Sequence, residues 1–98
     1  MDELIYNFTA WVHECNPAKL HGGLDKLVGK SGYHVLNKME HHFEPQGYTC
    51  LWLLAESHLA VHTFPENGKT YIELSSCNKE KNENFKKLFK EWQSTLNQ

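Results

Sequence analysis

The stretch that decides the fold runs from Tyr48 to Ser76 and reads YTCLWLLAESHLAVHTFPENGKTYIELSS. Its first seven residues are almost continuously apolar, which is typical of a strand buried on both faces. Polar and apolar residues then alternate over Ser57–Phe64 and again over Lys69–Ser76, as they do in half-buried strands. The segment Pro65–Gly68 between them is a turn sequence. The stretch therefore predicts hairpin-linked strands.

The flanking segments complete the sheet and add two helices. We expect a strand over Leu4–Val12, a second over Tyr33–Phe43, and a helix that starts at Asn16-Pro17 and ends near Gly29. A final helix is predicted from an apolar stripe at helical spacing, formed by Phe85, Leu88, Phe89, Trp92 and Leu96. These elements predict an α+β fold, a two-layer sandwich of an antiparallel sheet with helices packed on one face, built by residues 1–98 as a single domain.

Composition excludes several classes of protein. The 98 residues are 40% hydrophobic and 22% charged, which is too apolar for a disordered chain. The net charge is −2, and all ten cationic residues are Lys. Nucleic-acid recognition relies on Arg and on an excess of positive charge, so we do not expect a nucleic-acid partner.

Cysteine usage and hydropathy point to a cytoplasmic protein. The three cysteines, Cys15, Cys50 and Cys77, form no disulfide framework, and we see no signal peptide. No apolar run approaches the roughly 20 residues that span a bilayer, so no membrane partner is expected. A metal site is not expected either, because the cysteines lack paired short spacing and His41 and His42 point to opposite faces of a strand.

One group of neighbouring sequence motifs indicates a specific chemistry. The segment Leu54–Glu66, LAESHLAVHTFPE, is preceded by HHFEPQG at residues 41–47 and followed by LSSC at residues 74–77. These motifs closely resemble the self-cleaving core of the prokaryotic S-adenosylmethionine decarboxylases, whose members carry a pyruvoyl cofactor. The resemblance is strong over residues 41–77 and fades towards the termini.

The residue types suit that chemistry on their own terms. The Ser57 hydroxyl can attack the carbonyl of Glu56 and convert the amide bond into an ester that breaks more easily. A base must then remove the Ser57 α-proton, and an imidazole such as His62 titrates near neutrality. The alternation places His58 and His62 on one face of their strand, and His62 reaches Ser57 only if the sheet bends or the turn at Glu56-Ser57 curls back.

The resemblance implies the outcome of cleavage. A β chain of residues 1–56 and an α chain of residues 57–98 stay together, and Ser57 becomes the pyruvoyl cofactor. Its carbonyl forms a Schiff base with the small-molecule substrate and accepts the electrons that decarboxylation releases. Cys77 matches the family's acid that reprotonates the product, a role that suits a thiol.

Further positions carry over individually from the family. Thr49 falls where a serine assists self-processing, Phe43 matches an aromatic that stacks on the adenine of the substrate, and Glu66 matches an acid that holds the ribose hydroxyls. The resemblance also implies a homodimer, and a product that donates aminopropyl groups for spermidine synthesis.

Other functions stay open at this point. Asn7 and Trp11 stand where the family usually has a histidine and an acid, and related enzymes decarboxylate arginine or ornithine instead. A catalytically inactive regulatory paralogue is a further alternative, and a metal-binding module is another. We expect Trp52 and Trp92 in the core, and Trp11 in the core or at an interface.

Overall fold

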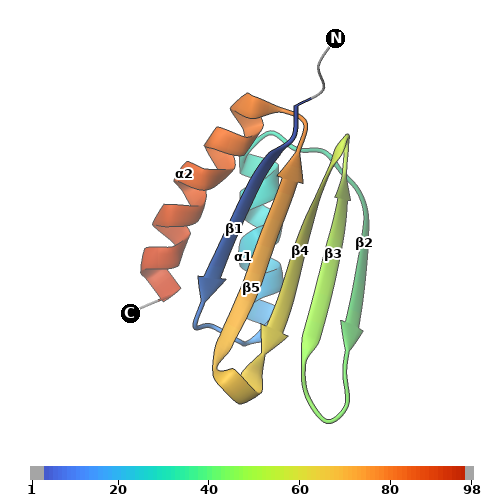
Figure 1. Cartoon of the computed structure of the whole chain (residues 1–98), viewed down its shortest axis with the longest axis vertical. Coiled ribbons are helices and arrows are strands. Elements are labelled where there is room, and N and C mark those ends of the chain that lie inside the picture. The colour runs from blue at the N-terminus through green and yellow to red at the C-terminus, as the bar shows by residue number, and fades with distance from the viewer. Residues whose placement is uncertain (1–3, 97–98) are drawn as a thin grey trace.

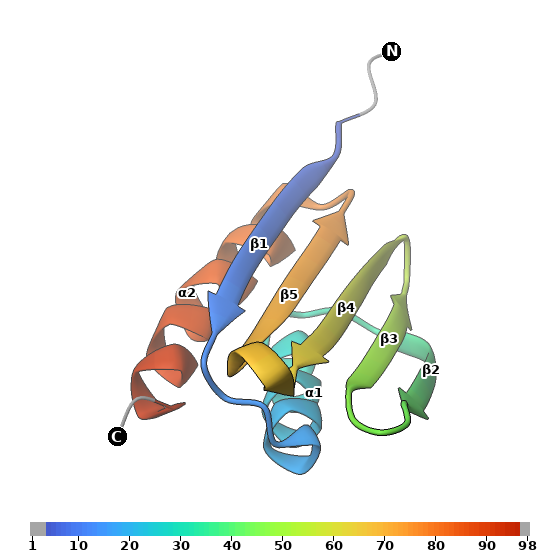
Figure 2. The same ribbon diagram turned by 60° about the horizontal axis from the view of Figure 1, so that its bottom comes forward.

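The computed structural model describes residues 4–96, which form one antiparallel sheet covered on one face by two helices (Figure 1). The five strands lie in the order β1-β5-β4-β3-β2. In chain order the elements are β1 (Tyr6–Val12), α1 (Pro17–Lys30), β2 (Val35–His42), β3 (Tyr48–Leu54), β4 (Ser57–Phe64), the short 3-10 turn η1 (Pro65–Asn67), β5 (Lys69–Ser76) and α2 (Lys79–Leu96). Figure 2 shows both helices behind the same face of the sheet. The predicted two-layer α+β sandwich is confirmed.

The C-terminal helix is longer than its apolar stripe predicts. It begins at Lys79, six residues before Phe85. The side chain of Asn78 accepts a hydrogen bond from the backbone N–H of Lys81 at 2.9 Å, which is the contact that a helix N-cap makes. Because the first turn after this cap is polar, hydrophobic periodicity alone could not locate the start of the helix.

The core lies between the helices and the inner face of the sheet. Trp52 and the predicted apolar positions of β4 and β5 are fully buried there, as is Cys50, which confirms them as core residues. The helices contribute chiefly Leu20, Leu24, Val28, Phe85 and Phe89. Trp92 packs partly buried against this cluster.

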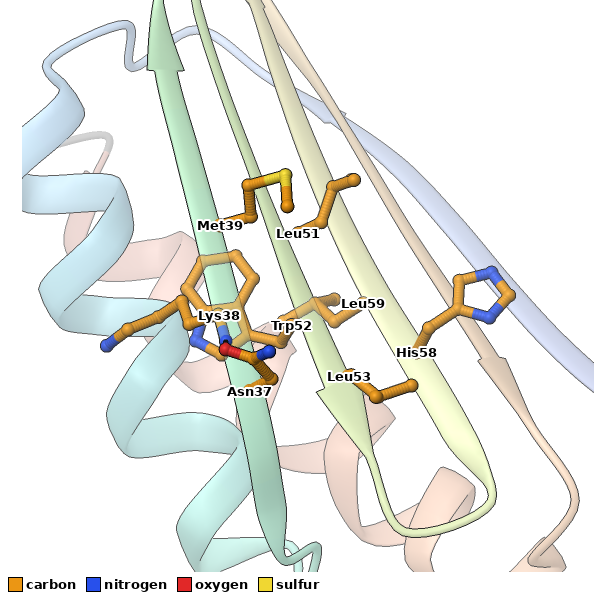
Figure 3. A pocket seen from close by; sticks show the side chains of 8 residues that line it. All are labelled: Asn37, Lys38, Met39, Leu51, Trp52, Leu53, His58 and Leu59. Atoms are coloured by element: carbon orange, nitrogen blue, oxygen red, sulfur yellow. Dashed lines mark hydrogen bonds between the residues drawn. The ribbon is translucent and has the colours of Figure 1, made fainter.

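The outer face of the sheet has no helix over it, and apolar side chains are exposed there. We call it the open face. Met39, Leu51 and Leu53 are 69%, 43% and 53% exposed, and they line a shallow hollow of about 420 Å³. Figure 3 shows His58 extending from this face, on the side of the sheet away from α1. Since residues two apart share a face, His58 and His62 lie on the open face together, as predicted.

Trp11 also belongs to the open face rather than to the core. It is 51% exposed, and its ring lies 5.1 Å from that of Tyr71 and 5.9 Å from that of Phe64. The Lys69 ammonium lies 4.7 Å from the Trp11 ring centre, which is cation–π distance. The core placement expected for Trp11 is therefore wrong, and its placement at an interface stays a prediction. Neither helix in the described part of the chain is long and apolar enough to cross a membrane.

Two adjacent glycines in α1 test the packing of the helices. A Cβ at Gly23 would lie 2.5 Å from Nε1 of Trp92, whereas one at Gly22 would meet nothing within 4 Å. We predict that Gly22→Ala stabilises the protein by up to about 1 kcal/mol through helix propensity. Gly23→Ala should destabilise it by about 1–3 kcal/mol, because Trp92 must move. Urea unfolding of both variants checks this, and equal effects would contradict the packing.

Candidate functional site

The turn between β3 and β4 sets the position of Ser57. Ala55 and Glu56 form the whole connection, since Leu54 pairs directly with Ser57. Glu56 has φ +62°, the one positive φ among non-glycine residues of the described chain. A non-glycine residue in this left-handed region costs roughly 1–2 kcal/mol. The backbone is therefore strained at the residue that precedes Ser57.

Hydrogen bonds hold the Ser57 hydroxyl against the end of β5. Ser57 Oγ donates to Ser76 Oγ at 3.3 Å and accepts from the backbone N–H of Cys77 at 3.4 Å. The hydroxyl of Tyr33 donates to the same Ser76 oxygen. Burial raises the pKa of Tyr33, so its hydroxyl stays protonated and able to donate. A buried network of hydroxyls thus orients Ser57.

Cys77 is exposed beside this network. Glu56, Ser57 and Cys77, which we call the Ser57 cluster, line a hollow of about 470 Å³ at this end of the sheet. His58 also borders it, together with apolar side chains that include Ile5 and Leu53. The hollow gives a small molecule access to both Ser57 and Cys77.

The other predicted residues gather at the opposite end of β4. Thr49 Oγ1 and His62 Nδ1 are hydrogen-bonded at 2.9 Å across the β3–β4 pair. Glu66 lies in η1, and its carboxylate accepts a hydrogen bond at 3.3 Å from Gln46 in the β2–β3 loop. Phe43 lies in the same loop. We call Phe43, Thr49, His62 and Glu66 the His62 cluster.

The two clusters are far apart within one chain. β4 is paired with both neighbours from Ser57 to His62, without a break in register. Five residues of extended strand place His62 about 16 Å from Ser57. In Figure 1 the β3–β4 turn is at the top of the sheet, and the β2–β3 loop and η1 are at the bottom. The described segment from Leu54 to His62 contains neither the bend nor the curled turn that would bring His62 to Ser57.

The sequence of the chain also matches a known protein family. A family model described as S-adenosylmethionine decarboxylase matches residues 7–97, almost the whole chain. The chain belongs to the S-adenosylmethionine decarboxylase family.

Several curated proteins are similar to this member of the family. A protein of Prochlorococcus marinus (strain MIT 9313) named S-adenosylmethionine decarboxylase proenzyme is 40% identical over 72 residues, which cover 67% of this chain and 58% of that protein. A protein of Synechococcus sp. (strain WH7803) with the same name is 48% identical over 72 residues, 67% of this chain and 56% of that protein. The chain therefore spans less than two thirds of the length of these relatives.

A solved structure shares the fold. The crystal structure of the adenosylmethionine decarboxylase from Aquifex aeolicus VF5 matches with a TM-score of 0.72, covering 90% of this chain and 78% of that one. Sequence identity is 21%, so the likeness concerns the fold alone.

Sequence reasoning missed two members of the Ser57 network. Tyr33 and Ser76 contact Ser57 directly or through one hydroxyl, yet they are 24 and 19 residues from it in the sequence. The alternation in β5 is the signal that could have found Ser76, because a short hairpin pairing places it opposite Ser57. No pattern in the sequence indicates Tyr33, which is brought in by the connection after α1.

Adjacent serines of β5 allow a test of the network. Ser76→Ala leaves the buried Tyr33 hydroxyl without its acceptor, so we expect a loss of about 1–3 kcal/mol in the free energy of unfolding. Ser75→Ala, on the half-exposed open face, should change it by less than about 0.5 kcal/mol. Urea unfolding measures both. Indistinguishable variants would mean that the network does not stabilise the protein.

Proposed function

We propose that the chain is a self-processing, pyruvoyl-dependent decarboxylase of S-adenosylmethionine, cleaved between Glu56 and Ser57 into chains of residues 1–56 and 57–98. Family membership supports the reaction class. The proposal rests on the structure around Ser57. Ser57 directly follows the strained Glu56, and its hydroxyl is oriented by Ser76 and by the amide of Cys77.

Self-cleavage needs no outside reagent other than water. Ser57 Oγ attacks the Glu56 carbonyl carbon, the C–N bond breaks, and an ester joins the two residues. Loss of the Ser57 α-proton then expels the Glu56 carboxylate and leaves a dehydroalanine. Tautomerisation and hydrolysis release ammonia and leave a pyruvoyl group at the start of the second chain.

The residues around Ser57 suit these steps. The positive φ of Glu56 is strain that breaking the 56–57 bond relieves. Ser76 accepts the hydrogen bond from Ser57 Oγ, which fixes the orientation of that hydroxyl beside the scissile peptide. These contacts fit a serine that is converted into a cofactor.

Cys77 is the residue we assign to the acid of the decarboxylation. A pyruvoyl group supplies a carbonyl that accepts the electron pair left when carbon dioxide departs. The exposed thiol of Cys77 borders the same hollow as Ser57, so it can deliver a proton to a carbon held there. A thiol is mostly protonated at neutral pH yet ionises readily.

The His62 cluster supplies the remaining roles. His62 acts as the base for the Ser57 α-proton, and its hydrogen bond to Thr49 fixes the orientation of the imidazole. Phe43 offers a flat face for adenine, and Glu66 offers two acceptor oxygens for ribose hydroxyls. Gln46 already holds the Glu66 carboxylate from the neighbouring loop.

A homodimer would join the two clusters. When two sheets stack face to face about an axis perpendicular to their strands, the two β4 strands run antiparallel. Ser57 of one protomer then lies near the His62 end of the other, which removes the separation of about 16 Å. The exposed apolar residues of the open face, including Met39, Leu53 and Trp11, are suited to burial in such an interface.

Two substitutions test the chemistry at the Ser57 cluster. We predict that Ser57→Ala gives one uncut chain that releases no carbon dioxide from S-adenosylmethionine. Cys77→Ala should still be cut but should turn over at least about tenfold more slowly, since general acid catalysis contributes 10²–10⁴-fold. Intact mass and carbon dioxide release are the measurements. A Ser57→Ala protein that decarboxylates S-adenosylmethionine would overturn the proposal. If the unmodified protein decarboxylates arginine and not S-adenosylmethionine, the roles given to Phe43 and Glu66 are wrong.

Co-expression tests whether the clusters act across protomers. We predict that Ser57→Ala and His62→Ala proteins each stay uncut when made alone. In a mixed dimer, the His62→Ala chain keeps Ser57 and receives His62 from its partner, so that chain should be cut. Two affinity tags and an intact-mass spectrum identify which chain breaks. If co-expression restores no cleavage while mixed dimers form, His62 does not act from the partner.

A further inference from the structure

A second group of reactive side chains lies on the helix side of the sheet. His21 of α1, Glu40 of β2 and Cys50 of β3 place an imidazole nitrogen, a carboxylate oxygen and a sulfur within 4.8 Å of one another. Three separate elements therefore converge on one point. Cys50 and the neighbouring Thr49 point to opposite faces of β3, so this point lies across the sheet from His62.

His21 has a nitrogen that lacks a partner. Its Nε2 is buried and makes no hydrogen bond in the described structure. The nearest carboxylate oxygen, on Glu40, lies 3.9 Å away, which is beyond hydrogen-bond distance. The ring is stacked on Trp52 with centroids 5.7 Å apart and planes 25° apart, so it is held in this direction. Leaving a buried polar nitrogen unsatisfied costs about 1–3 kcal/mol.

The other two donors are also positioned. Tyr48 donates its hydroxyl hydrogen to Glu40, which orients that carboxylate. Cys50 is fully buried and forms no disulfide. Burial raises the pKa of its thiol to about 11, so the thiol keeps its proton unless a cation replaces it.

We propose that His21, Glu40 and Cys50 bind a divalent transition-metal ion of the zinc class. Nitrogen, sulfur and carboxylate oxygen are the donor types that Zn²⁺ takes in proteins. Tetrahedral coordination needs donors about 3.5 Å apart, so the side chains close in by about 1 Å on binding. The Cys50 S–H bond breaks, the proton passes to solvent, and the sulfur bonds to the metal.

The surroundings provide access for an ion. An open hollow of about 380 Å³ is lined by His21, Glu40 and Tyr48. Asn16 and Pro17, at the start of α1, also line it. Water from this hollow can supply a fourth ligand. The Lys38 ammonium, which acts on both Glu40 and Cys50, is paired with Asp25 at 3.3 Å, and this pairing offsets its repulsion of a cation.

The ion would tie α1 to the sheet, independently of the decarboxylation proposed above. A ligand that binds only the folded chain stabilises it in proportion to the logarithm of its concentration over Kd. The site therefore predicts a melting temperature that rises with added Zn²⁺ and falls with a chelator.

The test uses the full-length protein, stripped with a chelator and titrated with Co²⁺ and then with Zn²⁺. We expect one equivalent to bind, with a thiolate-to-cobalt charge-transfer band that Zn²⁺ displaces. Cys50→Ala should abolish the band, and His21→Phe, which keeps a ring on Trp52, should weaken binding at least tenfold. Cys15→Ala is the matched control and should bind as the unmodified chain does.

Three results would overturn the site. One is that neither Co²⁺ nor Zn²⁺ binds at one equivalent, which would mean that His21 and Glu40 are close without holding a metal ion. Another is a charge-transfer band that survives in Cys50→Ala, which would place the thiolate ligand at Cys15 or Cys77. The third is unchanged binding in His21→Phe. Circular dichroism confirms folding of each variant, and if Cys50→Ala does not fold, His21→Phe decides the question.

Discussion

The register of β4 between β3 and β5 is the constraint on which the arrangement depends. It pairs Ser57 with Ser76 at one end of the strand and His62 with Thr49 towards the other. Because side chains alternate across a sheet, a slip of one residue would move His62 into the core and expose Leu59 and Val61 to solvent. The burial of those two apolar residues therefore fixes which polar residues can act, and the two-residue turn at Ala55-Glu56 fixes where β4 begins.

The same register separates the reactive groups that the proposed chemistry must unite. Ser57 and Cys77 lie at one end of the sheet, while His62, Thr49 and Glu66 lie at the other. A straight strand held by two neighbours cannot fold back to close that distance. An open face with half-exposed apolar side chains offers a solution, because a second copy can cover it and bring its own opposite end to Ser57.

Sequence patterns predicted most of the fold because short-range signals specify it. The alternation in Ser57–Phe64 and Lys69–Ser76 gave the strands and their buried faces, and the stripe from Phe85 to Leu96 gave the helix. The apolar stripe did not locate the start of α2, because the first turn after the N-cap Asn78 is polar. The motif identified Ser57 and Cys77, which the fold brings together. Tyr33 and the group around Cys50 could not be found, because their partners come from distant segments that only tertiary packing brings into contact.

If the Glu56–Ser57 bond breaks to create the cofactor, a denaturing intact-mass spectrum of the freshly purified protein will show the break. We expect two chains, residues 1–56 and 57–98, with the second lighter by the mass of ammonia than a chain that begins with serine. A single chain of 11.4 kDa that no condition converts would contradict self-processing. Cleavage at another bond would contradict the role assigned to the strained turn.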